Sequence, residues 1–490
     1  MAYERQEFID NKTVLTAKHL KNMEDEIVAL GAKVYGNIQL PTNKQLVLYT
    51  VFNDLKNGSS YRQLGNGTRN YGLSVYLDHL FVDTKETDTR FDDNGSTYKD
   101  FSQSIGSNTV IHNGGVTKYE TKHTCTVNDG DYSFKVVLRT IKNSATSSIK
   151  PIVMQIGDSV TNGTMASVPE VSGAPSTSWS WAKYYFDQDK KENSNSGFDA
   201  LFVGYSSTAS YTNYNGVSGK ACAEGHGGWS DSTYTKDGSP FYVDANTPFS
   251  LDAFISRYRT MDDSGNRLYF TTSKGTTGTA GTQNIGYLED GTVATDSNGN
   301  TLYIGSLITD TAFRDVCLPN VIIYQLGFNG YNTTNELKIL TSIKEEHPDM
   351  KLILSIIDIA HTNYPSLYPN WSGISGLSSS IHSTRNNQLN HFKWVVDTLS
   401  TKTYTSNGTQ YTFTEENGVY AVYSGCVIPI PFGQGYRVLV DDLNSSFGNI
   451  ETYHYVGLDK SEAKLHPSRF AHQKIGYLIY SMIKWIMYSD

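Results

Sequence analysis

Compact apolar runs alternate with amphipathic segments over the last two thirds of the chain. The runs are short and rich in Val, Ile and Leu, which is typical of strands that are buried on both faces. They lie at 151–156, 320–326, 351–357 and 419–423. Segments in which apolar residues recur with helical spacing follow several of them, at 334–346, 380–399 and 469–488. Strands that alternate with helices predict an α/β domain with a mostly parallel sheet over 149–490.

The chain has a different pattern between 36 and 148. Short apolar stretches such as QLVLYTVF and YSFKVVLRTI alternate there with polar turn clusters such as DDNGST. This alternation predicts a β-rich, sandwich-like accessory domain that precedes the α/β domain.

A loop-rich stretch at about 235–315 interrupts the α/β pattern. Two of its segments, MDDSGNRLYF and TDSNGNTLYI, are alike, and each predicts a polar turn that enters a strand. Asp296, Asn298 and Asn300 alternate as in a calcium loop. The Gly is misplaced and no Glu stands at the twelfth position, so a turn is expected instead. We interpret this stretch as a loop and hairpin insertion on the α/β domain.

Residues 13–31 predict a short helix within an N-terminal segment that spans 1–35. Its apolar stripe consists of Leu20, Met23, Ile27 and Leu30. A helix this short is marginal alone, so the stripe requires a partner. Two partners are open: the body of the same chain, or identical helices in a homo-oligomer.

Composition and charge narrow the classes of function. The chain has 490 residues and a net charge of -9, and its Lys and Arg residues form no long run, so nucleic acid is not an expected partner. The first residues are polar, and no apolar run approaches the roughly 20 residues of a membrane span. The expectation is neither a signal peptide nor a transmembrane helix. The cysteines are far apart and favour buried thiols over a zinc site or disulfides. They are Cys125, Cys222, Cys317 and Cys426. No metal and no cofactor are expected.

Two candidate blocks for chemistry contain glycines. Gly157-Asp158-Ser159 directly follows the run at 151–156, and the carboxyl end of such a strand is where working residues of α/β sheets lie. Ser159 is therefore a candidate nucleophile, although an Asp-Ser turn after Gly is common in itself. The second block, EGHGGWS, contains Gly225 and Gly228, and such a loop brings backbone amides close to a ligand.

Two further blocks supply an amide and an imidazole. Asn329 lies in QLGFNG, at the end of the run at 320–326. His466 precedes a proline in KLHPS, which places it in the loop before the last predicted helix. Each block alone is more typical of a turn or a structural histidine than of a catalytic site. Their order along the chain is what carries the functional interpretation.

With these four blocks the chain resembles the GDSL/SGNH hydrolase superfamily, which is named for its Ser, Gly, Asn and His. The resemblance covers about 150–490 and lies mainly in the blocks. It implies a three-layer α/β/α fold and a serine esterase. Ser159 matches the nucleophile, and His466 matches the general base. Gly228 is the best match for the oxyanion-hole glycine, with Gly225 as the fallback, and Asn329 matches the side-chain oxyanion donor.

One position departs from the family pattern. The family usually has an Asp three residues before the His, and this chain has Ala463 there. The Asp normally fixes the imidazole tautomer and stabilises the imidazolium. Glu462 and Asp459 are the nearby acids that would replace it, and a backbone carbonyl would otherwise orient the ring of a Ser-His dyad.

The resemblance to carbohydrate-active members of this superfamily implies removal of O-acetyl groups from a polysaccharide. Ester hydrolysis would proceed through an acyl-Ser159 intermediate. Trp229 and Gly225 of the second block, and Asp158 beside Ser159, are the expected substrate-binding residues. Trp179 and Trp181 are either an aromatic platform for a sugar or part of the core.

FIDNKTVLTAKHLKNMEDEI at 8–27 resembles the leading segment of many bacteriophage tail and baseplate proteins. Asn11 and Lys21 depart from that pattern, but the Leu-Thr-Ala and Asn-Met-Glu elements agree with it. The resemblance implies a virion protein that is anchored to other tail proteins through this segment as a homo-oligomer. Its esterase would act on acetylated glycans at the surface of a bacterial host.

Two rival functions are open at this point. A weakened hydrolase domain, without its acid at Ala463, would serve as a glycan-binding adhesin or a structural tail protein. A cellular lipid or acyl esterase with an unrelated N-terminal segment is the other alternative. Release of acetate separates the first rival from the esterase, and the mass in solution bears on the second.

Overall fold

The computed structural model describes most of 150–258, 318–356, 377–423 and 466–488. It also describes separate strands between 37 and 142, between 260 and 307, and at 427–429. The N-terminal segment 1–35 and the Asp296–Asn300 stretch lie outside the described residues. The helix expected at 13–31 is therefore a prediction still.

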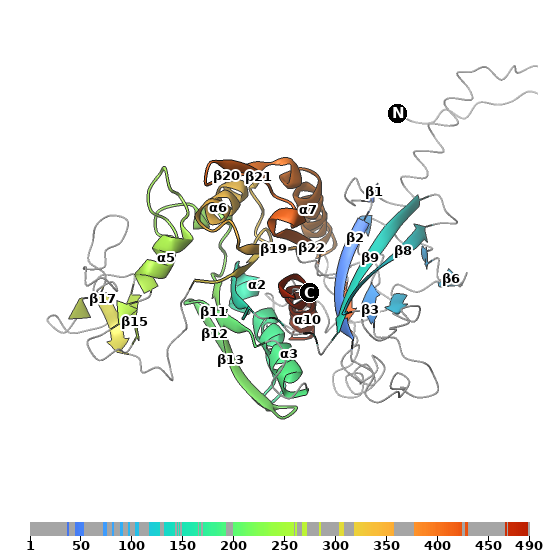
Figure 1. Ribbon diagram of the computed structural model, residues 1–490, viewed down its shortest axis with the longest axis horizontal. Helices are drawn as coiled ribbons and strands as arrows, with labels where there is room; N and C mark the ends of the chain where they lie inside the picture. The colour runs from blue at the N-terminus through green and yellow to red at the C-terminus, as the bar shows by residue number, and fades with distance from the viewer. Residues whose placement is uncertain are drawn as a thin grey trace, which may run out of the picture.

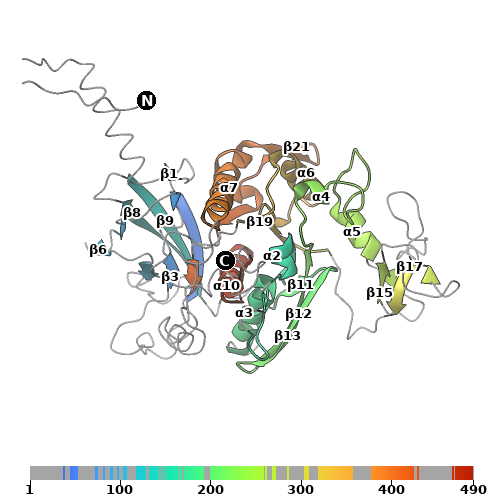
Figure 2. The same ribbon diagram turned by 180° about the vertical axis from the view of Figure 1, so that it is seen from behind.

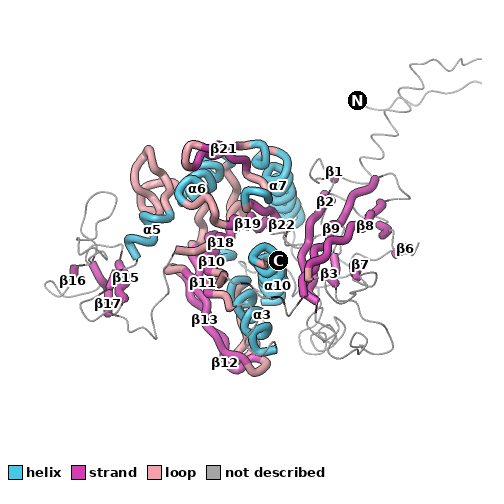
Figure 3. Tube along the Cα trace, in the orientation of Figure 1, coloured by secondary structure: helices cyan, strands magenta, loops and turns pink. Residues whose placement is uncertain are grey.

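A mostly parallel sheet forms the centre of the described α/β region, as predicted. Its strand order is β12-β13-β10-β18-β19-β22, and β11 pairs with the first half of β10. Every pairing is parallel except β12 with β13. Figure 3 shows these strands following one another across the sheet. Their bounds are β10 Ile152–Gly157, β11 Leu201–Val203, β12 Ser207–Tyr214, β13 Val217–Gly225, β18 Val321–Gln325, β19 Lys351–Ile356 and β22 Val419–Tyr423.

The predicted strands form because their sequences are apolar on both faces. All residues of β18 are buried, as are all but the first of β10 and β19. A strand covered on both faces must be apolar at every position, so it has no alternation. The β12–β13 hairpin was not predicted, because it is rich in Ser, Thr and Gly.

Three of the described α-helices lie where the helical spacing predicted them, and the others were not predicted. Asn332 caps α6, where its side chain accepts hydrogen bonds from the amides of Thr334 and Asn335. The longest helix that was missed is α3, whose Ser, Lys and Asp residues hide its apolar stripe. The helix α5 falls in the stretch at 235–315 that was expected to form loops and a hairpin. The described helices are α2 Ser159–Asn162, α3 Ser178–Glu192, α4 Asp231–Tyr234, α5 Leu251–Tyr258, α6 Thr333–Glu346, α7 Leu377–Asp397 and α10 Arg469–Met487, with 3-10 turns η5 Leu399–Thr401 and η6 Glu415–Asn417.

The last helix joins two parts of the molecule. On one side α10 packs along α3, where the buried Lys484 ammonium pairs with Asp189. On the other side lie β2 Gln45–Phe52 and β9 Tyr132–Lys142, and the Tyr477 hydroxyl bonds to the Val51 backbone. Figures 1 and 2 show α10 between the central sheet and these strands from both sides. The side chains of Val51 and Ile141 share one apolar core with the α/β region.

The described elements between 36 and 148 are strands, in agreement with the predicted β-rich character. The largest group has the order β2-β9-β8-β5-β6. One strand from the α/β region, β23 Val427–Pro429, pairs with β3 of this part. The other strands between 36 and 148 are β1 Asn37–Ile38, β3 Gly72–Val75, β4 Phe81–Val82, β5 Thr89–Phe91, β6 Thr97–Tyr98, β7 Gln103–Gly106 and β8 Lys118–Val127.

Two smaller sheets complete the described structure. The two similar segments of the insertion form β15 and β17, which pair antiparallel with one another, so both predicted strands are confirmed. A short hairpin, β20–β21, lies next to α6. The bounds are β14 Thr260–Met261, β15 Arg267–Thr271, β16 Asn284–Ile285, β17 Tyr303–Leu307, β20 Thr403–Ser406 and β21 Thr409–Thr412. Within the described residues no helix is both long enough and apolar enough to span a bilayer.

Candidate active site

Three neighbouring strands of the central sheet end at the same level. The pairing register sets Gly157 of β10 opposite Gly225 of β13 on one side and Gln325 of β18 on the other. The three blocks that follow these strands therefore emerge at one edge of the sheet. This is the carboxyl edge, where working residues of parallel sheets lie.

The strand β10 ends at Gly157, and the short helix α2 begins at Ser159, one residue further on. Asp158 is the N-cap of α2, and its Oδ1 accepts a hydrogen bond from the Val160 amide at 2.9 Å. At the other end of α2, the indole of Trp179 donates to the Thr161 carbonyl at 2.8 Å. Capping at both ends holds a four-residue helix that would not form alone.

The turn between β10 and α2 requires glycine at its start. A Cβ atom at Gly157 would overlap the Thr161 hydroxyl and lie 2.6 Å from the Gln325 carbonyl oxygen. The Gly157 carbonyl itself accepts hydrogen bonds from the His226 amide at 3.0 Å and the Tyr234 hydroxyl at 2.7 Å. The backbone that leads into Ser159 is therefore fixed on both sides.

The predicted base lies against the predicted nucleophile. Nε2 of His466 is 2.8 Å from Oγ of Ser159, across 307 residues of chain. The ring of Phe328, which precedes Asn329, lies 5.9 Å from the His466 ring between centroids. Ser159 is buried, with 8% of its surface exposed. A hydroxyl in hydrogen-bond contact with an imidazole is an arrangement that nucleophilic catalysis uses.

The start of α10 positions His466. The guanidinium of Arg469 donates to the carbonyls of Ala174 and Pro175, at 3.0 and 2.8 Å. One turn later, Nδ1 of His472 accepts a hydrogen bond from the Ser178 amide at 3.1 Å, at the start of α3. These two contacts tie the loop that carries His466 to the body of the domain.

His472 serves this role as a neutral ring. Burial, together with nearby His466 and Arg469, lowers the pKa of His472 to about 3. Because Nδ1 accepts from a backbone amide, the proton of the neutral ring is on Nε2. Neither His472 nor Arg469 was predicted from the sequence, since neither differs locally from an ordinary helix residue.

The second block forms a loop that faces the third block. Gly228 has a left-handed backbone (φ 77°), which favours glycine, and the side-chain amide of Asn329 donates to the Trp229 carbonyl at 3.2 Å. Gly225 lies deeper, where a Cβ atom would overlap the backbone of Asn162. Gly228 and Gly227 are exposed. The structure thus brings the loop of Gly228 to Asn329, whereas Gly225 serves close packing on α2.

The carboxyl group of Asp158, which caps α2, is also fully buried. Burial raises its pKa to about 7, although the backbone amides of Val160 and Phe328 counteract the shift. The carboxyl group lies between the first and third blocks and does not reach solvent. We therefore assign it to positioning rather than to contact with a substrate.

A buried polar network supports the sheet edge beneath Ser159. Nε2 of Gln155 donates to Gln325 Oε1 at 2.8 Å and to the hydroxyls of Thr161 and Ser178 at 3.1 Å. Nε2 of Gln325 in turn lies 3.3 Å from the hydroxyl of Ser355. These bonds link β10, β18, β19, α2 and α3 below the nucleophile. Buried networks of this kind specify one arrangement of the elements that they join.

The turn that carries Asn329 is held at both ends. The Gly327 carbonyl accepts from Gln388 Nε2 at 2.8 Å. The Asn332 amide donates to Oδ2 of Asp231 at 2.8 Å. The Tyr324 hydroxyl donates to the other oxygen of Asp231. Burial and the nearby Glu336 carboxylate raise the pKa of Asp231 to about 6.

A buried ion pair lies under the same turn. Nε2 of His391 is 2.8 Å from Glu336 Oε2, and both side chains are almost completely buried. The His391 ring stacks on Tyr331 at 4.5 Å and lies close to Gly327. Sequence reasoning missed Asp231, Glu336 and His391. The signal was faint, since His391 falls next to the predicted apolar face of its helix.

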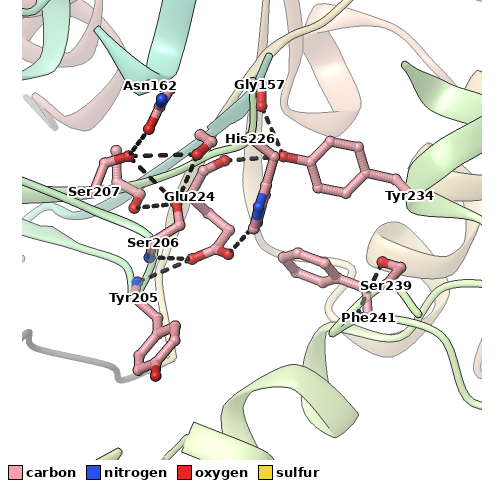
Figure 4. Close-up of polar contacts among 12 residues, drawn as sticks. Gly157, Asn162, Tyr205, Ser206, Ser207, Glu224, His226, Tyr234, Ser239 and Phe241 are labelled. Atoms are coloured by element: carbon pink, nitrogen blue, oxygen red, sulfur yellow. Dashed lines mark hydrogen bonds and ion pairs between the residues drawn. The ribbon is translucent and has the colours of Figure 1, made fainter. Parts of the chain in front are cut away.

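A second histidine–carboxylate pair lies in the Gly-rich block itself. Nε2 of His226 is 2.6 Å from Oε1 of Glu224, and Glu224 is completely buried. Oε2 of Glu224 accepts from the amides of Tyr205 and Ser206, at 2.9 and 3.1 Å. Figure 4 shows the carboxylate between these amides and the imidazole. The block was recognised for its glycines, and its two ionisable residues were not assigned a role.

The aromatic residues differ in where they lie. Trp179 and Trp181 are each 1% exposed and belong to the core, so a sugar platform made by these two is wrong. Trp181 packs against the rings of Tyr184 and Tyr214, as large aromatics do in cores. Trp229 is only half-buried and stacks on His226 at 3.9 Å.

The structure does not describe the acids that were predicted to orient His466. Ala463, Glu462 and Asp459 are outside the described residues. What orients the His466 ring is therefore a prediction still.

One group of metal-ligand type occurs among the described residues, at Asp252, Glu346 and His347. Glu346 Oε2 accepts from the Leu251 and Asp252 amides, at 2.9 and 3.3 Å, and so caps α5. His347 Nε2 lies 2.9 Å from Asp252 Oδ1. Helix capping and one ion pair account for these three side chains.

No family model, no curated protein and no solved structure matches this chain. The chemistry of the site therefore follows from its own geometry. That geometry is a hydroxyl beside an imidazole, next to a glycine loop and a side-chain amide at one edge of a parallel sheet.

Proposed function

We propose that the chain is a serine esterase of the GDSL/SGNH type, with Ser159 as nucleophile and His466 as general base. The observation that carries this proposal is the contact of 2.8 Å between Ser159 Oγ and His466 Nε2, at the carboxyl edge of the sheet. A three-layer α/β/α arrangement of the domain is part of the proposal.

Each group has a role in the proposed reaction. His466 takes the proton of Ser159 as the hydroxyl attacks the ester carbonyl carbon, and it then returns the proton to the leaving alcohol. The amides of Ser159 and Gly228 and the side chain of Asn329 stabilise the oxyanion. An amide group has two N–H bonds, so Asn329 is able to keep its bond to the Trp229 carbonyl and donate the other. Water then attacks the acyl-enzyme and releases the acid.

The acid of the triad belongs to the proposal as well. Glu462 or Asp459 would accept the second ring N–H of His466 in place of the residue at Ala463. In another serine hydrolase, neutralising the equivalent acid lowers turnover by about 10⁴. A Ser-His dyad oriented by a backbone carbonyl would be slower than a triad but would use the same bonds.

The proposed substrate is an acetylated polysaccharide of a bacterial surface. We assign the protein to a phage tail, where the segment 1–35 would join other tail proteins in a homo-oligomer. The N-terminal sequence resemblance supports the assignment to a tail, and the half-buried Trp229 beside the Gly228 loop supports a sugar substrate. An aromatic face of this kind is suited to a sugar ring.

The experiment compares Ser159→Ala with the wild-type protein in hydrolysis of para-nitrophenyl acetate. We expect turnover to fall by at least about 10³ because the acyl-enzyme cannot form. Ser210→Ala is the matched control, since Ser210 is exposed on β12. Wild-type rates in the Ser159→Ala protein would refute the assignment of the nucleophile.

A binding function is the other outcome of this test. If the wild-type protein releases no acetate but binds acetylated oligosaccharides in calorimetry, the domain is a glycan-binding module. Loss of the usual acid at Ala463 is the observation that favours this outcome.

A further inference from the structure

Glu224 and His226 form a pair that the proposed reaction does not use. They flank Gly225 at the end of β13, one strand away from the β10 turn that leads to Ser159. The pair is held from three sides. Two backbone amides donate to Glu224 Oε2, the His226 amide donates to the Gly157 carbonyl, and the indole of Trp229 covers the imidazole. The only polar atom of this fixed imidazole that is left for a ligand is its second ring nitrogen, Nδ1.

The hydrogen bonds determine what that nitrogen does. A carboxylate only accepts hydrogen bonds, and Glu224 lies at 2.6 Å from Nε2 of His226, so Nε2 carries a proton. In the neutral ring Nδ1 then has a lone pair and acts as an acceptor. Within the part of the chain that the structure describes, no protein group forms a hydrogen bond to this Nδ1. The His226 side chain is 21% exposed, so the ring has access to solvent.

The surroundings of the ring leave space for a ligand. A Cβ atom added at Gly228 would meet no atom within 4 Å, and one added at Gly227 would meet only the Asn162 amide group at 3.9 Å. Both glycines are exposed. The imidazole, the bare backbone and the indole of Trp229 thus form one open surface next to Asn329, whose amide bonds to the Trp229 carbonyl.

We propose that this surface is a sugar subsite in which Nδ1 of His226 accepts a hydrogen bond from a free hydroxyl of the sugar that carries the ester. The inference rests on the proposed function, because it concerns the alcohol side of the same ester. A hydroxyl donor satisfies the imidazole lone pair and an aromatic face meets a sugar ring, whereas an aliphatic chain would bury the lone pair without a partner. Glu224 is a positioning residue that sets the tautomer.

The first test uses two kinds of ester, sugar esters and a plain ester, that share an acetyl group and differ in the alcohol. O-acetylated xylo-oligosaccharides and O-acetylated chito-oligosaccharides have free hydroxyls, whereas para-nitrophenyl acetate has none. His226→Phe keeps an aromatic ring beneath Trp229 and removes Nδ1. We expect the ratio of kcat/KM for the sugar ester to kcat/KM for the plain ester to fall about fivefold to tenfold, the effect of one hydrogen bond.

The matched control is His347→Phe. His347 also pairs with a carboxylate, Asp252, but it lies just before β19, at the opposite edge of the sheet. Its replacement should leave the ratio unchanged. A ratio that stays constant in His226→Phe would overturn the subsite, because the imidazole would then serve only the fold or the common chemistry.

The second test examines the tautomer directly. In Glu224→Gln the amide oxygen would accept from the backbone amides of Tyr205 and Ser206, so the NH₂ group would face His226. The proton would then move from Nε2 to Nδ1. Nitrogen-15 shifts of the His226 ring, measured at a pH at which the ring is neutral, should show Nε2–H in the wild-type protein and Nδ1–H in the variant. A wild-type ring protonated at Nδ1 would refute the proposal.

Failure of the esterase assignment is distinguishable from failure of the subsite. If the wild-type protein hydrolyses neither ester, calorimetry with deacetylated xylo- and chito-oligosaccharides tests the subsite alone. Binding that is weakened in His226→Phe and kept in His347→Phe would support the subsite without any esterase activity. No binding of any of these oligosaccharides would overturn it.

Discussion

Two histidine–carboxylate pairs at the same edge of the sheet differ in what surrounds them. His226 and Glu224 lie 2.6 Å apart in the Gly-rich loop, and the His226 side chain is 21% exposed. His391 and Glu336 lie 2.8 Å apart under the turn of Asn329, and their side chains are 2% and 1% exposed. The chemical groups are identical, so the difference between the two pairs comes from their surroundings, and first from their burial.

The pair of His391 and Glu336 has a structural role because it is buried. Burial by itself lowers the pKa of His391, but the Glu336 carboxylate outweighs it and the pKa is raised. The imidazole is enclosed between Tyr331 and Gly327, so it has no route to a substrate. It fixes the turn that presents Asn329. His226 has the same kind of partner but keeps one nitrogen at the surface, where a ligand is able to meet it.

The largest expected effect comes from breaking the buried pair. Glu336→Gln removes the carboxylate that pairs with His391, so a protonated His391 has no counter-charge in the interior. At pH 5, where the imidazole of an unfolded chain is protonated, we expect the free energy of unfolding to fall by about 3 kcal/mol. Urea unfolding measures this loss. The turn of Asn329 should also loosen, so kcat for sugar esters and plain esters should fall together.

The matched control for that change is Glu416→Gln, which alters an exposed carboxylate in η6 and should shift stability by less than about 0.5 kcal/mol. A loss below about 1 kcal/mol in Glu336→Gln would contradict the structural role of the buried pair.

A buried carboxyl without a histidine partner extends the comparison. Burial raises the pKa of Asp158 from 3.8 to about 7. Between these values the unfolded chain has lost the proton and the folded chain keeps it, so this group makes stability fall as pH rises. From pH 5 to pH 7 we expect the wild-type protein to lose about 2 kcal/mol more than Asp158→Asn, as measured by urea unfolding at both pH values. Equal slopes in the two proteins would show that the carboxyl titrates as in an unfolded chain.

The smallest expected effect concerns the rings that stack on each imidazole. Trp229 lies 3.9 Å from the ring of His226, and Tyr331 lies 4.5 Å from that of His391. Trp229→Leu and Tyr331→Leu should each lower the free energy of unfolding by about 1 kcal/mol. Their kinetics should differ: the first lowers the preference for sugar esters, and the second lowers kcat for both esters. The same kinetic change in both variants would remove the distinction between the pairs.

Local pattern predicted most of the α/β framework. The strands β10, β18, β19 and β22 and the helices α6, α7 and α10 form where apolar runs and helical spacing placed them. The reason is that a strand covered on both faces is apolar at every position, and a helix with one buried face has an apolar stripe. Both patterns are visible in the sequence of the element itself. Polar elements such as α3 and the β12–β13 hairpin show no clear apolar pattern, so they were not predicted.

The candidate site shows the same division. Ser159, Asn329 and His466 each follow a strand or precede a helix, so their positions at one edge of a parallel sheet were predictable from short segments. The directions of Trp179 and Trp181 were not, because a tryptophan suits a core and a sugar site equally well until its neighbours are known.

Amino-acid order along the chain thus decided which strands and helices form and where a nucleophile, an amide and an imidazole stand on them. Only the folded structure decided which polar groups meet. His466 bonds to Ser159 across 307 residues, and His391 pairs with Glu336 across 55. Contacts at such separations depend on how whole elements pack and on which side chains lose water, and no short segment carries that information.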